Sequence, residues 1–147
     1  RLHLSAVGRL RRVRRTIEIQ TPRTIGKNTM TPVKAFCQYI VVFQALPETI
    51  SMSKHFVAEC GFCVAELRKI RNYKWFCARV SLWRAGKELA NEYLGCCCYK
   101  TAEEFYTTYE GDDFADMVRT CALEIGDAEL LTMVNQWHEA FRLKLAA

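Results

Sequence analysis

The stretch from Trp75 to Gly126 constrains the fold most, because it holds most of the local structure signals in the chain. In its first part, apolar side chains occupy every second position, from Phe76 to Leu82. This spacing is typical of a β-strand. Gly86 supplies the conformational freedom that a tight turn needs, and apolar residues resume at Leu89. The stretch therefore begins with a predicted β-hairpin.

Two helices are expected directly after the hairpin. Thr101 stands three residues before Glu104, the spacing of a capping box, and predicts a helix from Ala102 to about Tyr109. Asp112 or Asp113 then begins a second helix that ends at Gly126. Its apolar residues recur at intervals of three and four: Phe114, Met117, Val118, Cys121 and Ile125.

The remaining segments complete an α+β domain. A single strand is expected over Val33 to Leu46, and short helices after Ser51 and from Val64. The longest predicted helix runs from Asp127 to Leu145. We expect a small antiparallel sheet, made of a central strand and the hairpin and covered on one face by helices. The small residues from Gly95 to Cys98 should admit the bulky face of the last helix and bury Trp137.

The first 29 residues differ in charge from all the others. They carry eight basic side chains against one acidic, a net of +7 in a chain of net +5. Residues 1–29 are therefore treated as a basic arm or extension, and residues 30–147 as one domain. The arm has several interpretations: a nucleic-acid-binding segment, a targeting peptide, an extension upstream of a natural start at Met30, or a solvated tail.

Eight cysteines raise the question of a metal site or a disulfide framework. Cys60 and Cys63 have the spacing of a zinc knuckle, but no second pair with that spacing follows. The adjacent Cys96, Cys97 and Cys98 would alternate between the faces of a strand. We interpret the cysteines as free thiols in a reducing cytoplasm, and we assign no metal ligand, cofactor or catalytic residue.

Two surfaces are candidates for binding. Residues 101–147 carry ten acidic against three basic side chains, a net of −7, which predicts a helical face that docks on a basic nucleic-acid-handling protein partner. The predicted partner-binding residues are Glu103, Glu104, Glu110, Asp112, Asp113 and Asp116. The alternative is direct nucleic-acid binding by the basic arm and an aromatic, basic hairpin face. Its residues are Arg11, Arg12, Arg14, Arg15, Arg79, Trp83, Arg84 and Lys87. No apolar run reaches the roughly 20 residues that cross a bilayer, so no membrane partner is expected.

The segment YLGCCCYKTAEEFYTTY, followed by DDFADMV, resembles small uncharacterised proteins of bacteriophages and other mobile elements. Such compact α+β proteins with acidic helical surfaces include inhibitors of bacterial defence systems of the anti-CRISPR type. The resemblance implies a phage-encoded inhibitor that acts in the host cytosol without a cofactor. The basic arm departs from that pattern.

Overall fold

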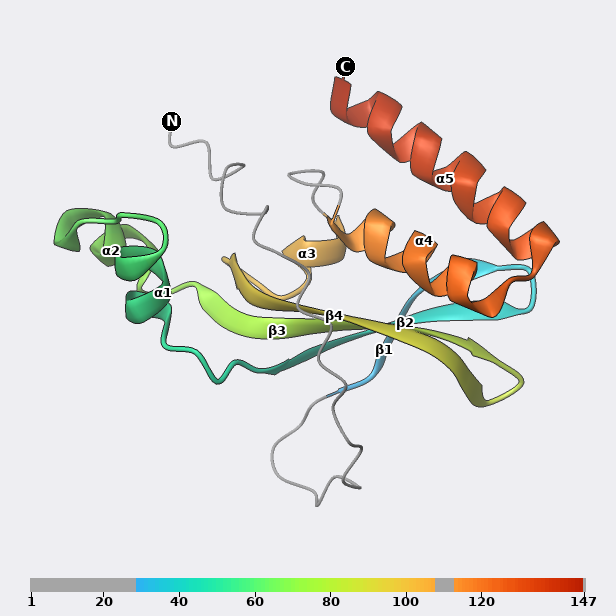
Figure 1. Cartoon of the computed structure of the whole chain (residues 1–147), viewed down its shortest axis with the longest axis horizontal. Helices are drawn as coiled ribbons and strands as arrows, with labels where there is room; N and C mark the ends of the chain where they lie inside the picture. Colours follow the sequence, from blue (N-terminus) through green and yellow to red (C-terminus); the bar gives the residue numbers. More distant parts are fainter. Residues whose placement is uncertain (1–28, 108–112, 147) are drawn as a thin grey trace.

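A computed structural model describes residues 29–107 and 113–146 of the chain. Within these ranges four antiparallel strands form one sheet in the order β1-β2-β3-β4 (Figure 1). The strands are β1 (Thr31–Phe36), β2 (Tyr39–Pro47), β3 (Lys74–Arg84) and β4 (Lys87–Tyr99). The helices are α1 (Met52–Ala58), α2 (Val64–Ile70), α3 (Glu104–Thr107), α4 (Asp113–Ile125) and α5 (Ala128–Ala146). The α+β class and the antiparallel sheet are confirmed.

The helices occupy two places relative to the sheet. Helices α3, α4 and α5 lie over one face, whereas α1 and α2 lie at one end of the sheet (Figure 1). The core fills the space beneath α3, α4 and α5, because alternate residues of the strands point towards them. Its members include Val41, Phe43, Phe76, Val80, Leu82, Phe105, Val118, Cys121, Leu130 and Val134, all buried.

The predicted single strand over Val33 to Leu46 is wrong, since the structure divides it into β1 and β2. The chain reverses between Phe36 and Tyr39, which pair with each other. Cys37 adopts a φ of 53° in this turn, a conformation usually left to glycine or asparagine. The sequence carries no usual turn residue there, so the reversal gave no signal.

The expected position of Trp137 is also wrong. The residue is half-buried, and its ring lies against Phe36, Phe114 and Phe141, with centroid distances of 5.5, 6.0 and 5.7 Å. Helix α5 therefore packs on α4 and β1, and α4 rather than α5 covers β3 and β4. The space beside Gly95 is taken by the carboxylate of Glu48, which would lie 3.0 Å from an added Cβ.

Helix boundaries follow the expected capping chemistry in most places. Asp127 Oδ1 accepts hydrogen bonds from the amides of Glu129 and Leu130, which begins α5 as predicted. Gly126 has a φ of 75° and ends α4. The start of α3 differs from the prediction. Glu104 Oε2 accepts from the amide of Lys100 at 3.1 Å instead of that of Thr101, and the helix starts at Glu104.

Candidate functional site

Four of the predicted partner-binding acids lie on the helical layer over the sheet, at its α3 and α4 end. Glu103 is exposed just before α3, and Glu104 is half-buried in its first turn. Asp113 and Asp116 lie in the first turn of α4, where the positive end of the helix dipole stabilises carboxylates. Glu110 and Asp112 lie outside the described residues. The structure thus brings the described acids to one region of the layer.

These acids differ in whether their carboxylates are already engaged in contacts within the domain. Asp116 Oδ1 lies 2.7 Å from His138 Nε2 and ties α4 to α5. The Glu104 carboxylate is used by the Lys100 amide. Glu103 lies near the side chain of Tyr106, whose pKa is raised by burial and by that negative charge. Asp113 is half-buried, whereas Glu103 is exposed, so Glu103 is the best placed of the four for an outside contact.

Further acids extend this surface along the layer. Glu124, Glu129 and Glu139 are exposed on α4 and α5. We call α3, α4 and α5 with their acidic side chains the acidic helical layer. The layer also carries three exposed basic residues, Arg119, Arg142 and Lys144. Other exposed basic residues lie on α1, α2 and the turn that follows: Lys54, Arg68, Lys69, Arg71 and Lys74. Acidic side chains therefore outnumber basic ones on the layer, but the layer is not free of positive charge.

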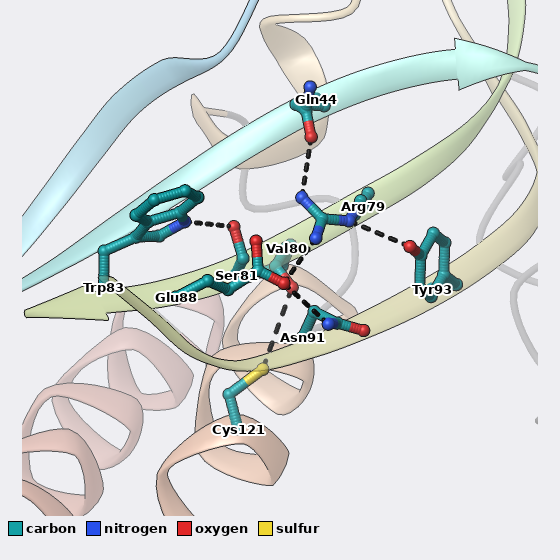
Figure 2. A network of polar contacts seen from close by, with 9 residues as sticks. All are labelled: Gln44, Arg79, Val80, Ser81, Trp83, Glu88, Asn91, Tyr93 and Cys121. Atoms are coloured by element: carbon teal, nitrogen blue, oxygen red, sulfur yellow. Dashed lines mark hydrogen bonds and ion pairs between the residues drawn. The ribbon is translucent and has the colours of Figure 1, made fainter. Parts of the chain in front are cut away.

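Arg79, a predicted nucleic-acid contact, lies at the centre of a polar network on the sheet face opposite α4 (Figure 2). Its Nε donates to the Tyr93 hydroxyl at 2.9 Å, and its Nη1 donates to Gln44 Oε1 at 2.7 Å. Its Nη2 forms an ion pair with Glu88, which also accepts from Asn91. Burial acts to lower the pKa of Arg79, but the bonds with Glu88 and Tyr93 outweigh it and raise that pKa.

The geometry of this network explains what Arg79 does in the domain. All three guanidinium nitrogens are engaged by side chains from β2 and β4, so the residue fastens three strands together. A phosphate would have to displace these partners to reach it. The sequence reasoning missed the network, because Gln44 and Glu88 are far from Arg79 in the chain and become its neighbours only through strand register.

The other hairpin residues are less confined. Trp83 is half-buried, and its Nε1 donates to Ser81 Oγ at 2.9 Å on the same strand (Figure 2). Arg84 is exposed, although its Nη1 donates to the Tyr39 hydroxyl at 3.0 Å. Lys87 is exposed and pairs with Arg84 at the hairpin turn. Arg11, Arg12, Arg14 and Arg15 lie outside the described residues.

The cysteines are all free thiols in the described residues. Cys97 and Cys121 are buried in the core, and burial raises both pKa values, that of Cys121 to about 12. Burial also raises the pKa of Cys96 and of Cys98 to about 11. Within the part of the chain that the structure describes, no group of three or more His, Cys, Asp or Glu side chains is arranged to hold a metal ion.

One constellation was missed by the sequence reasoning. Cys60 Sγ lies 3.7 Å from His55 Nε2, and His55 Nδ1 lies 3.1 Å from Glu59 Oε2. From the sequence, Cys60 was considered as half of a zinc knuckle and interpreted as a free thiol, and His55 was not paired with it. A histidine on a short helix, one turn before a glutamate and a cysteine, was the available signal.

None of the helices in residues 29–107 and 113–146 is both long and apolar enough to span a lipid bilayer. Searches of protein-family models, curated proteins and solved structures found no match to this chain.

Proposed function

We propose that this protein is a cofactor-free interaction module that binds a basic surface of another protein through the acidic helical layer. The observation that carries the proposal is the position of the acidic residues. Glu103, Glu124 and Glu129 are exposed on the layer formed by α3, α4 and α5. Arg119, Arg142 and Lys144 are exposed on the same layer, so its negative charge comes from the excess of acidic over basic side chains. The basic residues of α1 and α2 lie at the end of the sheet and do not add to this layer.

The charge layout favours a partner whose own surface is strongly basic. A groove that binds nucleic acid is such a surface, because it is lined by Lys and Arg that neutralise phosphates. An acidic helical layer would be steered towards that groove and would exclude the nucleic acid by occupying it. The resemblance to defence inhibitors suggests a host CRISPR-Cas complex as the target class.

Charge reversal at residues without a structural role tests the proposal. Glu103→Lys combined with Glu124→Lys changes the layer by four charges, and neither carboxylate caps a helix in the structure. Pull-downs from purified nucleic-acid-handling complexes should show that this variant loses binding, and that added salt weakens the parent. Unchanged binding by the reversed variant would refute the proposal.

A matched control separates local charge from net charge. Gln38 and Thr49 are exposed residues outside the acidic helical layer. Gln38→Lys with Thr49→Lys adds two positive charges, as many as Glu103→Lys alone. We expect this control to bind as the parent does, while the single Glu103→Lys variant binds more weakly.

Direct nucleic-acid binding is the second candidate, and the exposed tip of the hairpin favours it. Arg84 and Lys87 are paired in register there, next to the half-buried Trp83. Such a tip would contact phosphates, and its affinity would fall steeply with salt because phosphate contacts release counterions. A gel-shift assay at low salt tests it. Binding that weakens in Lys87→Ala would support this candidate, and the absence of any shift by the full chain would exclude it.

A further inference from the structure

Two cysteines lie in a short loop between α1 and α2. The loop reads Cys60-Gly61-Phe62-Cys63, and Gly61 adopts a φ of 71° that lets the chain turn sharply. The amide of Phe62 donates to the carbonyl of Phe56 at 2.9 Å, which folds the loop back on α1. Cys60 is half-buried at the inner side of the loop, whereas Cys63 is exposed at its end.

A buried histidine adjoins the inner cysteine. His55 is only 2% exposed, and its ring packs against the rings of Phe56 and Trp75 at centroid distances of 5.3 and 5.5 Å. Its Nε2 lies 3.7 Å from Cys60 Sγ. Its Nδ1 has no hydrogen-bond partner with good geometry, but it lies 3.1 Å from Glu59 Oε2. An imidazolium formed here would therefore have a carboxylate beside it.

We propose that Cys60 and Cys63 form a redox-active dithiol that is oxidised to a disulfide by low-molecular-weight disulfides, with His55 as the base for Cys60. Two cysteines separated by two residues have the spacing that is characteristic of dithiol redox motifs. The assignment is independent of the interaction proposed for the acidic helical layer, which uses other helices.

The reaction proceeds in two thiol-disulfide exchanges. The exposed Cys63, as its thiolate, attacks one sulfur of the small disulfide. The new Cys63 bond forms, the old sulfur-sulfur bond breaks, and the first small thiolate leaves and takes up a proton. Cys60 then gives its proton to His55 Nε2 and attacks the Cys63 sulfur. The second small thiolate leaves with the proton that His55 releases. Two protein thiols are oxidised, and one small disulfide is reduced to two thiols.

The different environments of the two cysteines suit these roles. Burial and the charge of Glu59 raise the pKa of the Cys60 thiol. A thiol of raised pKa is a poor first nucleophile, and it needs a base when it resolves the mixed disulfide. The neighbouring imidazole supplies that base, and the Glu59 carboxylate stabilises the imidazolium that forms. The exposed Cys63 is the thiol that an outside disulfide can reach.

Mass spectrometry of the full chain after equilibration with oxidised and reduced glutathione tests the proposal. The reaction is quenched with acid, free thiols are alkylated, and the remaining disulfides are mapped on peptides. We expect an internal Cys60-Cys63 disulfide in the parent. Cys60→Ser should instead hold glutathione on Cys63. Cys37, the other exposed thiol, should form only a mixed disulfide with glutathione. A Cys37→Ser variant is the matched control, and it should form the internal disulfide as the parent does.

The role of His55 is tested by the rate of the second step. In His55→Gln the Cys63 mixed disulfide should accumulate, because its conversion to the internal disulfide slows by about tenfold or more without the base. Conversion at the parent rate in this variant would overturn the role of His55. Disulfides from Cys60 to Cys77 or Cys96, or a Cys60 that stays reduced while Cys63 carries glutathione, would overturn the dithiol assignment. The dithiol assignment is therefore tested on the parent protein, and the test does not depend on any variant being folded.

Discussion

His138 Nε2 on α5 lies 2.7 Å from Asp116 Oδ1 on α4, and this contact fastens the two helices to each other. Arg119 Nε donates to Asn135 Oδ1 at 2.9 Å between the same helices, a little further along. Because the Asp116 carboxylate is engaged by His138, it is less available to a binding partner than Glu103 is. His138 lies on an otherwise apolar stripe of α5, but it is half-buried because its ring contacts Asp116 at the α4–α5 interface instead of entering the core.

Loss of this contact should destabilise the domain modestly. His138→Gln or Asp116→Asn should each lower the free energy of unfolding by about 0.5 to 1.5 kcal/mol, the usual net worth of one side-chain hydrogen bond. Urea unfolding of both variants and of the double variant measures the coupling between them. Strictly additive losses would show that the two side chains do not interact in solution.

A second prediction concerns Glu48, which crosses to the bulge of β4. Its Oε2 accepts from the amide of Cys96 at 2.8 Å, and its Oε1 accepts from the amides of Thr49 and Ile50. Glu48→Ala should cost about 1 to 3 kcal/mol, because these donors lose their acceptor. Thermal unfolding is the measurement. A melting temperature equal to that of the parent would mean that water replaces the carboxylate fully.

Gly95 provides the matched test of the same contact. A Cβ added at Gly95 would lie 3.0 Å from Glu48 Oε2, so Gly95→Ala forces the carboxylate to shift. We expect Gly95→Ala to destabilise the parent, but to have a smaller effect once Glu48 is alanine. The difference between the two backgrounds, taken from denaturant curves, isolates the steric contact. Equal effects in both would contradict it.

The pH dependence of stability should follow Tyr39 and Asp127. The Tyr39 hydroxyl donates to Asp127 Oδ2 at 2.6 Å. This bond is the main reason that the pKa of Asp127 lies below its ordinary value and that of Tyr39 above it. The Asp127 contribution to stability is therefore present above the ordinary aspartate pKa and is lost as the pH falls through the lowered value. The Tyr39 contribution is present below the ordinary tyrosine pKa and is lost as the pH rises through the raised value.

Tyr39→Phe tests the predicted losses of stability at low pH and at high pH with one substitution. It removes the hydroxyl and keeps the ring, which is 2% exposed in the core. The variant should lose less stability than the parent between neutral pH and strong acid, and also between neutral pH and strong base. Free energies of unfolding at several pH values provide the comparison. Parallel curves for the two proteins would show that the bond does not shift either group.

Trp137 should contribute less to stability than a fully buried tryptophan. The ring is half-buried between Phe36, Phe114 and Phe141. Trp137→Ala should cost about 2 to 3 kcal/mol, below the 3 to 5 kcal/mol typical of a buried aromatic. Leu143 lies on the same helix and is 64% exposed, so Leu143→Ala should change stability by less than about 0.5 kcal/mol. Equal melting temperatures for both variants would mean that α5 is not packed.

The features that sequence predicted well are those set by local chemistry. Alternation from Phe76 to Leu82 gave β3, and Gly86, with a φ of 74°, gave its turn. Gly126 marked the end of α4, and the Asp127 cap marked the start of α5. In each case one or two neighbouring residues determine the turn or the helix end, and tertiary contacts do not change it.

The features that sequence missed depend on which elements meet. An apolar stripe showed that α5 buries one face, but it did not show that α4 lies between α5 and the sheet. The small residues near Gly95 indicated a close approach, yet the approaching group is the Glu48 carboxylate and not a helix. The Arg79 network joins residues through strand register, where no motif marks them. The contact of His55 with Cys60 spans a helical turn, and only the spacing of His55, Glu59 and Cys60 indicated it.

The most direct test of the acidic helical layer is displacement of nucleic acid from a basic partner. The full chain is titrated against a purified, guide-loaded CRISPR-Cas complex bound to fluorescent target DNA, and the anisotropy of the DNA is followed. We expect the anisotropy to fall, and the midpoint of displacement to rise about tenfold or more in Glu103→Lys/Glu124→Lys, equivalent to about 1.4 kcal/mol of binding free energy. The Gln38→Lys/Thr49→Lys control should displace DNA as the parent does, whereas Glu103→Lys alone, which changes the charge by the same amount, should displace it less well. Displacement by the reversed variant at the parent midpoint, or binding of the chain to the DNA itself, would contradict the proposed function.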